Sequence, residues 1–253
     1  MTPHDLWQIG DTAAALAVAG ERADTGDDRA KLLHFEIAAA LGRTTIARAA
    51  LRSIVRSDDD WLDSRRDFVR LLKACIHRRL CGYGFLFDAV PAHAGARRAA
   101  LRAERRGDPD RARRLVDLAD GGSPTIAGHV DGREFAELRD IDDGFASVLE
   151  VLAGSRALLI PWEQIRRVRL IPAEGLLDTV LCPAELRLST GDDLACRLPL
   201  HYAGRRNLTR ETNRRQRDNG PIRGTGARML LTHDEEFLLS DCRQIDIMPV
   251  VVT

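Results

Sequence analysis

Apolar residues recur with a helical period through the first half of the chain. They are spaced three or four positions apart, so each run forms one stripe along a helix while the other faces stay polar. The apolar positions of three such runs are Phe68, Leu71, Leu72, Cys75, Ile76 and Leu80; Ala112, Leu115, Val116 and Ala119; and Ala47, Ala50, Leu51 and Ile54. The pattern predicts a series of amphipathic helices.

Short polar breaks separate these predicted helices. In the break Gly107–Asp110, Gly107 suits the end of one helix and Asp108 suits the cap of the next. Pro109 fits the first turn of that next helix, because proline has no N–H group to leave unpaired. A similar break at Gly42–Thr45 offers a threonine as cap.

Helix pairs joined by short turns are typical of an α-solenoid. Residues 31–60 have about the length of one tetratricopeptide unit, and Leu41 and Gly42 followed by Ala47 resemble the small-residue spacing of that repeat. Residues 10–28 resemble half of another unit. Two interpretations stay open, a solenoid with a groove for a partner helix and a plain helical bundle.

The pattern changes near residues 119–125, where a stretch rich in glycine, serine and proline indicates a boundary. Beyond it, apolar and polar residues alternate. Leu186 and Leu188 precede the turn Thr190–Asp193, and Leu194–Leu200 alternate again, which predicts a β-hairpin. A short helix is expected around Pro161–Arg166. Further predicted strands are Arg166–Ile171, Arg228–Thr232, Glu236–Ser240 and Arg243–Met248.

These patterns together predict an α+β protein of two domains. Residues 1–122 form an α-helical, tetratricopeptide-like solenoid or bundle. Residues 123–253 form a small, mostly antiparallel sheet or partly closed barrel with few helices.

The bulk composition is that of a globular protein rather than a disordered one. The formal net charge is zero, so no overall field attracts nucleic acid or an anionic membrane, and neither is an expected partner. No run approaches the ~20 apolar residues of a membrane-spanning helix, and a cytoplasmic location is expected. Five cysteines without a C-x-x-C pair predict buried free thiols rather than disulfides or a zinc site.

Candidate chemistry is sparse, and we expect no enzymatic activity and no cofactor. The seven histidines are scattered, and neither G-x-S-x-G nor H-E-x-x-H occurs. Asp140 and Asp142 have the spacing of the first two EF-hand ligands, but Gly144 stands where a third ligand is needed and Glu150 comes one residue early. A capped turn or an arginine-paired acidic surface is the expectation for this segment. A carboxylate site for Mg²⁺ built on Asp140, Asp142, Asp143 and Glu150 is kept as an alternative.

Two glycine patterns and two arginine clusters complete the survey. Gly220–Gly226 precedes a predicted strand rather than a helix, so it offers no helix N-terminus to a phosphate, and Cys81–Gly84 fits a helix cap and turn. Arginines crowd Arg97–Arg114 and Arg205–Arg217 without aromatic residues for base stacking. A solvated helix face and a flexible loop are expected. The alternative is an acidic protein surface as partner, either on another protein or on the acidic segment Asp131–Glu150 of the same or a neighbouring subunit.

A series of short motifs runs through the second half of the chain. Residues 131–140 follow the pattern D-G-x-x-F-x-x-L-R-D, residues 160–165 are close to V-P-x-x-x-I, and residues 199–202 follow P-x-x-Y. Residues 208–212 follow L-x-R-x-T, and residues 224–231 follow G-x-G-x-R-M-L-L. In this order, the motifs resemble those of the ImpE/TagJ family of type VI secretion accessory proteins. The aromatic residues that the family usually has at three places are absent here, notably at Leu158–Leu159 and Cys182.

The resemblance implies a non-enzymatic adaptor that binds the N-terminal helix of the small contractile-sheath subunit (TssB/VipA-like) near the ClpV ATPase. A general interaction scaffold with an acidic partner, or a metal-dependent enzyme, are the alternatives. The matched residues define the fold or a partner surface. They are Asp131, Gly132, Phe135, Leu138, Arg139, Asp140, Asp142, Asp143, Glu150, Pro161, Ile165, Tyr202, Arg210, Thr212, Gly224, Gly226 and Arg228.

Overall fold

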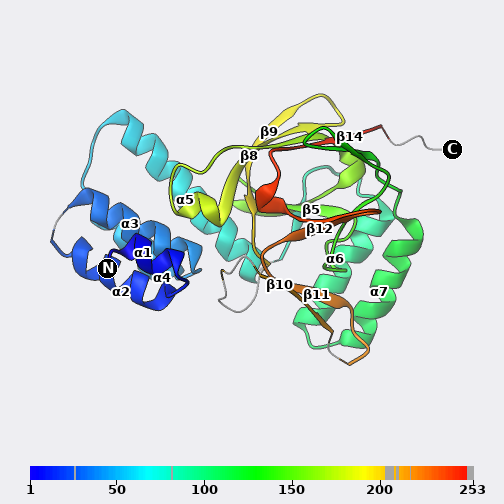
Figure 1. Cartoon of the computed structure of the whole chain (residues 1–253), viewed down its shortest axis with the longest axis horizontal. Coiled ribbons are helices and arrows are strands. Elements are labelled where there is room, and N and C mark those ends of the chain that lie inside the picture. Colours follow the sequence, from blue (N-terminus) through cyan, green and yellow to red (C-terminus); the bar gives the residue numbers. More distant parts are fainter. Residues whose placement is uncertain (26, 81, 203–207, 209–210, 217, 250–253) are drawn as a thin grey trace.

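The computed structural model describes residues 1–25, 27–80, 82–202, 208, 211–216 and 218–249. Within this part, helices fill the first half of the chain, as the periodicity predicts (Figure 1). Helices α1 to α4 form one group at the left of the view, the long α5 leads from them to the sheet, and α6 lies beside α7. The helices are α1 (Pro3–Gln8), α2 (Thr12–Ala23), α3 (Asp28–Ala40), α4 (Thr44–Ser53), α5 (Asp59–Leu80), α6 (Ala92–Arg105) and α7 (Pro109–Gly122).

Local chemistry explains where these helices begin. Helix α7 starts at Pro109, and the Asp108 carboxylate accepts a hydrogen bond from the Arg111 backbone N–H at 3.1 Å, which confirms the predicted cap. The predicted threonine cap of α4 is wrong. That helix already includes Thr44 and follows Arg43, which makes no side-chain cap hydrogen bond.

Strands make up most of the second half and pair into three sheets. The largest has nine strands in the order β1-β6-β5-β9-β8-β7-β14-β2-β3. A three-stranded sheet has the order β13-β12-β4, and β10 pairs with β11. The strands are β1 (Gly84–Phe85), β2 (Gly128–Val130), β3 (Arg133–Phe135), β4 (Leu138–Asp140), β5 (Val148–Ala153), β6 (Arg156–Pro161), β7 (Ile165–Leu170), β8 (Leu181–Leu188), β9 (Asp193–Pro199), β10 (Thr212–Gln216), β11 (Ile222–Gly226), β12 (Met229–Thr232), β13 (Glu236–Leu238) and β14 (Gln244–Ile247).

The predicted α+β class and antiparallel pairing are confirmed. Strands β8 and β9 form the predicted hairpin with Leu186 opposite Leu194, and the parallel exception is β1 with β6. In the described part of the chain the large sheet does not form a closed barrel, because it ends at β1 on one side and at β3 on the other. The tetratricopeptide repeat stays a prediction, since packing of α2 on α3 and of α3 on α4 fits a bundle equally.

Two smaller expectations for the second half need correction. The helix expected around residues 161–166 is a single 3₁₀ turn, Trp162–Gln164, because β7 already begins at Ile165. The loop expected across residues 205–217 contains β10, and residues 203–207, 209–210 and 217 lie outside the described part. The described cysteines are free as predicted, and Cys81 also lies outside that part.

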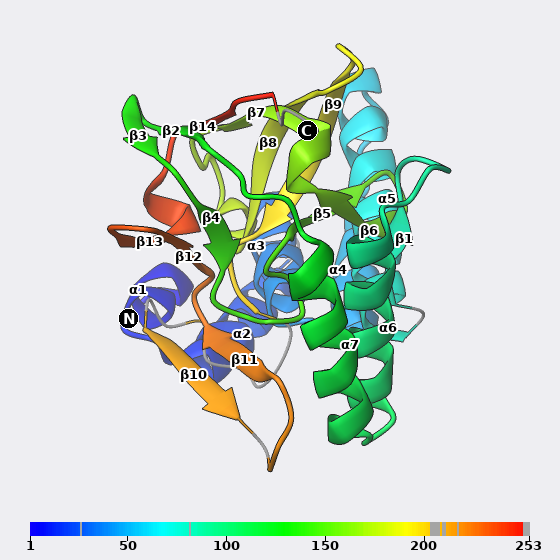
Figure 2. The ribbon, with the colours of Figure 1, turned by 90° about the vertical axis from the view of Figure 1, so that its right-hand side faces the viewer.

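The hydrophobic core is continuous between the helices and the sheet. Phe35 and Leu72 from the helical half share one buried cluster with Phe145, Leu159 and Leu177 from the second half. Helix α5 packs on β5 and β6, and α6 also contacts β6 (Figure 2). Helix structure ends at residue 122 and β2 begins at residue 128, so the boundary predicted between 122 and 123 falls in this connection, but its independence as a domain border stays a prediction.

Candidate functional site

Acidic residues of the family motif lie inside the protein, together with arginines from distant parts of the chain. We call this group the acid–arginine cluster. Its carboxylates stand at the end of β4, in the turn that follows and in β5, and its arginines come from α5, from β11 and from the residue before β12. The members are Asp140, Asp142, Asp143, Glu150, Arg78, Arg223 and Arg228.

Arg228 is the centre of the cluster and is 1% exposed. Its guanidinium donates to Asp140 at 2.9 Å and to Glu150 at 2.5 Å. The same group lies over the rings of Phe145 and Tyr202, 4.7 and 5.0 Å from their centroids. Its side chain is therefore fixed by charge on one side and by aromatic faces on the others.

Glu150 connects the sheet to the helical half. Arg78, at the end of α5, donates to its two carboxylate oxygens at 2.5 and 2.8 Å, the bidentate geometry in which arginine binds carboxylates best. Arg78 also donates to the His201 carbonyl oxygen at 3.2 Å. A single buried carboxylate thus holds α5 and the segment around Arg228 together.

Asp142 organises the turn between β4 and β5. Its carboxylate accepts backbone N–H groups from Gly144 at 2.8 Å and from Gly224 at 3.0 Å. The Arg223 Nε donates to both of its oxygens at 2.9 Å, and the same guanidinium pairs with Glu104 of α6. The turn is capped, as predicted, but it is buried rather than part of an acidic surface.

Asp143 joins the same turn to α6 and β11. Its carboxylate accepts the Ile222 N–H at 2.7 Å and the Arg139 guanidinium at 3.1 Å. Its backbone carbonyl accepts from the buried Arg97 at 2.6 Å, and Arg97 also pairs with Asp120. The turn after β4 therefore meets helices and strands from most of the chain.

Burial and pairing shift the pKa values of these carboxyls in different directions. Burial raises the pKa of Asp142 well above its ordinary range, and the adjacent Asp140 charge raises it further. Burial also raises the pKa of Asp140, although Arg228 opposes it. Burial alone would raise the pKa of Glu150 as well, but the charges of Arg78 and Arg228 outweigh it and lower that pKa.

This arrangement leaves little room for metal chemistry at the predicted carboxylates. Their oxygens already accept from guanidinium and backbone N–H groups, and a metal ion would have to displace these donors. Across the described residues, no group of three or more His, Cys, Asp or Glu side chains is placed to hold a metal ion.

A second buried polar chain lies nearby and was missed at the sequence level. His93 of α6 contacts Ser147 Oγ through Nδ1 at 3.0 Å and Glu163 Oε1 through Nε2 at 2.7 Å. The residue types match a hydrolase triad, but His93 is 4% and Ser147 is 7% exposed, and Arg97 Nε lies 3.3 Å from the serine oxygen. The chain ties α6 to the turn before β5 and to the end of β6.

The other predicted site residues lie apart from the cluster. Asp131 and Gly132 form the two-residue turn between β2 and β3, both with positive φ, and the Asp131 carboxylate accepts the Gln244 N–H at 2.8 Å. The Thr212 hydroxyl donates to the Ala227 carbonyl oxygen at 2.9 Å. Arg210 lies outside the described residues. Four further members are buried in the core around the large sheet: Phe135, Leu138, Pro161 and Ile165.

Two glycines of the motif are explained by close packing against the cluster. Gly224 lies against the Tyr202 ring, where an added Cβ would come within 2.4 Å of it. Tyr202 in turn donates to Asp140 at 2.6 Å. Gly226 has φ +83°, and an added Cβ would lie 2.0 Å from the Glu211 carbonyl oxygen.

Sequence reasoning missed Arg78 and Arg223 as partners of these acids, whereas it named the acidic segment 131–150 as an alternative partner of the arginine cluster 97–114. Arg78 follows apolar positions on α5 without distinction from its exposed neighbour Arg79. Arg223 stands in a glycine-rich segment that was not among the predicted strands. The cluster 97–114 also divides, because Arg97 is buried while Arg102 and Arg106 are exposed. One weak signal for these partners was available from charge balance. If the acids of a neutral chain are buried, cations have to be buried with them.

Comparison with known proteins finds a family model that matches part of the second half of the chain. Residues 132–246 match the model of the ImpE protein family, so the resemblance predicted from the sequence is confirmed. The type VI secretion system accessory component TagJ of Pseudomonas aeruginosa (strain PAO1) is 25% identical over 261 residues, covering 98% of this chain and 92% of that protein.

The fold is also found in a solved structure. The crystal structure of protein VPA1032 from Vibrio parahaemolyticus superposes with a TM-score of 0.88 at 18% identity, covering 97% of both chains. The same arrangement of the helical half and the sheet therefore occurs in another protein. None of the helices in the described part of the chain is long and apolar enough to cross a membrane.

Proposed function

We propose that this chain is a non-enzymatic accessory protein of a bacterial type VI secretion system and acts in the cytoplasm. The proposal rests chiefly on one observation, the similarity to the accessory component TagJ along 98% of the chain. A match of that extent covers the helical half and the sheet together, so it supports a shared role for the whole protein rather than for one domain.

The partner in this proposal is the N-terminal helix of the small sheath subunit (TssB/VipA-like), bound near the ClpV ATPase. The family resemblance supplies this partner, and the helical first half offers the kind of surface that takes a partner helix. No nucleic acid or membrane partner is part of the proposal, in keeping with a formal net charge of zero.

The chemistry of the acid–arginine cluster supports a structural role for the family-motif residues rather than catalysis. Asp140, Asp142 and Glu150 are at most 1% exposed and are paired with arginines. A catalytic acid or base has to reach its substrate, and these carboxyls do not reach the surface. We infer that they hold the helices on the sheet and thereby shape the surface that binds.

The test is a titration of the purified protein against a fluorescently labelled N-terminal peptide of the small sheath subunit from the same organism. Fluorescence anisotropy is expected to show saturable binding with a Kd of about 10 µM or tighter, or about −7 kcal/mol. A peptide with a central helix-breaking proline is the control and is expected not to bind.

Absence of binding by a helical peptide to a folded protein would contradict the sheath-subunit role. Circular dichroism of both components makes that result interpretable. Equal binding of the proline-containing peptide would contradict recognition of a helix, because it would show contact without helical structure.

A further inference from the structure

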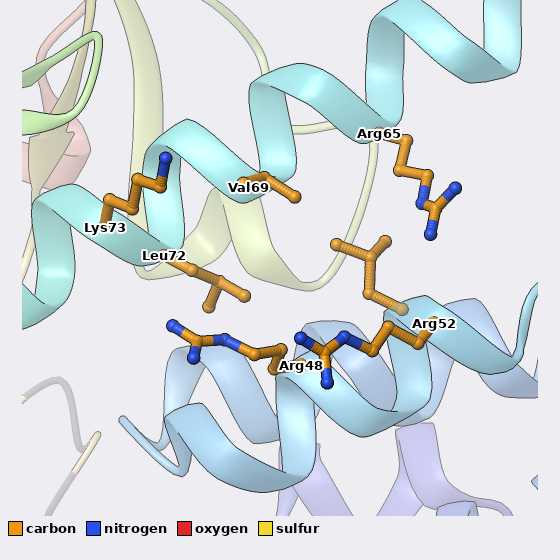
Figure 3. Close-up of a pocket in the computed structure, with 7 residues that line it drawn as sticks. Arg48, Arg52, Arg65, Val69, Leu72 and Lys73 are labelled. Atoms are coloured by element: carbon orange, nitrogen blue, oxygen red, sulfur yellow. The ribbon is translucent and has the colours of Figure 1, made fainter.

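Helices α4 and α5 enclose a hollow that the acid–arginine cluster does not use. Its volume is about 280 Å³, and Figure 3 shows side chains from both helices directed into it. Leu51 of α4 and Leu72 of α5 form an apolar floor and are 2% and 3% exposed, while Val69 at its side is 39% exposed. The hollow therefore presents apolar surface to solvent next to a well-packed base.

Cations surround this apolar floor. Arg48 and Arg52 stand one turn apart on α4, and Arg65 and Lys73 stand on the facing helix (Figure 3). No carboxylate lines the hollow. Among the described residues, these four cations form no ion pair.

Neighbouring positions on α5 differ from the cations of the hollow, because two of their arginines are paired. Arg66 pairs with Asp63 at 2.5 Å, and Arg70 pairs with Asp67 at 3.1 Å, each one turn back along the helix. Asp63 and Asp67 of α5 are thus paired with arginines outside the hollow. Four unneutralised cations around an apolar floor form a surface complementary to an acidic, partly apolar ligand.

We propose that the groove between α4 and α5 is the docking site for an acidic amphipathic helix of a partner protein. The apolar stripe of that helix packs on the exposed Val69, above the buried base of Leu51 and Leu72, and its flanking carboxylates face Arg48 and Arg52 on one side and the α5 cations on the other. The floor is aliphatic, so it offers no aromatic ring for stacking bases, and a peptide fits it better than a nucleic acid.

This inference goes beyond the proposed function, because it assigns a place and a charge to the ligand without requiring a sheath subunit. Its test accordingly uses designed peptides. One 18-residue helical peptide carries leucine at every third or fourth position and glutamate on both sides of that stripe. A second peptide keeps the leucines and replaces each glutamate by lysine.

The test measures anisotropy of the labelled peptides with the full-length protein and three variants. The glutamate peptide is expected to bind the wild type and to bind R48E/R52E at least tenfold more weakly. It is expected to bind R102E/R106E unchanged, since this control reverses two exposed arginines with the same spacing, Arg102 on α6 and Arg106 directly after that helix. Val69→Gln, which removes apolar surface without changing charge, is expected to weaken binding several-fold.

Three outcomes would overturn the groove assignment. They are equal binding of the lysine peptide, equal weakening by the α6 control, and no binding of the glutamate peptide to the wild type. Preference for a single-stranded oligonucleotide at the same face would do so as well. Thermal melts confirm that each variant is folded. If the designed peptides do not bind the groove, the sheath-peptide titration still tests the proposed function. If the sheath peptide does not bind, the designed peptides still test the groove.

Discussion

At the scale of single residues, Arg228 shows how this protein keeps charges away from water. Its guanidinium contacts two buried carboxylates and two aromatic rings, and its backbone N–H donates to the Leu200 carbonyl oxygen at 2.7 Å. Buried ion pairs contribute little net stability compared with apolar packing, but the loss of one partner leaves the other charge uncompensated. The cluster therefore contributes more to selecting one arrangement of the chain than to the net stability of that arrangement.

Arg228→Met is expected to lower the free energy of unfolding by about 3–5 kcal/mol, because Asp140 and Glu150 lose a shared buried cation. Urea unfolding measures this change. Arg187→Met is the matched control, since Arg187 pairs with Asp193 on the surface, and it is expected to cost about 0–1 kcal/mol. Equal effects of the two substitutions would contradict the central role of Arg228.

Glu150 gives the cluster a defined dependence on pH. Its folded-state pKa is below the ordinary value of 4.5, so the unfolded chain takes up this proton first as the pH falls. The stability that Glu150 contributes is therefore complete above about 4.5 and is lost as the pH falls through the lower folded-state pKa.

Glu150→Gln is expected to be less stable than the wild type at pH 7 and to lose less stability between pH 5 and pH 3. Urea unfolding at several pH values gives both slopes. Asp142 and Asp140 act in the opposite direction, because a raised folded-state pKa favours folding as the pH falls. The variant also lacks the Glu150 charge that helps to raise the pKa of Asp140, so this opposing contribution is smaller in it. Parallel pH profiles for the two proteins would show that Glu150 is not paired as described.

At the scale of elements, strand β11 depends on close backbone contact. Gly226 ends this strand and has a positive φ, and the Glu211 carbonyl oxygen occupies the space of its missing Cβ. The residue after next is Arg228, so the backbone at Gly226 helps place the guanidinium in the cluster.

Gly226→Ala is expected to destabilise the protein by more than Gly191→Ala, which should cost about 1 kcal/mol. Both glycines have positive φ, but nothing lies within 4 Å of an added Cβ at Gly191. Dihedral strain is therefore common to both substitutions. The difference between their losses of unfolding free energy measures the cost of the backbone contact at Gly226. Equal costs would mean that the backbone relaxes at Gly226.

The sequence predicts these elements well where a single period or a turn decides them. The α5 stripe, the capped start of α7 and the β8–β9 hairpin follow from local spacing and from glycine, aspartate and proline chemistry. Strand β11 and the burial of Asp140 do not, because both depend on residues some eighty positions away in the chain. Burial of an acid in a neutral chain is decided by its partner, and no local pattern identifies that partner.

At the scale of the whole molecule, the helices and the sheet share one core. Arg78 of α5 pairs with Glu150, Glu104 of α6 pairs with Arg223, and Phe35 and Leu72 are buried with Phe145 and Leu159. Unfolding of either half would expose this shared surface and break several buried ion pairs at once. The two halves are therefore expected to unfold together, even if each also forms a recognisable unit.

Denaturant unfolding of W7F/W61F tests this coupling, because Trp162 alone then reports on the second half and far-ultraviolet circular dichroism reports mainly on the helices. The fluorescence and dichroism transitions are expected to coincide. Two separate midpoints would instead favour residues 1–122 and 123–253 as independent domains.

The parallel pairing of β1 with β6 has a consequence for solubility. An exposed sheet margin offers unpaired N–H and C=O groups to any other extended chain and so invites intermolecular pairing. Here the two-residue β1, contributed from the helical half, covers part of β6, and the opposite margin is the three-residue β3. The segment that follows α5 thus protects the sheet against polymerisation through its strands.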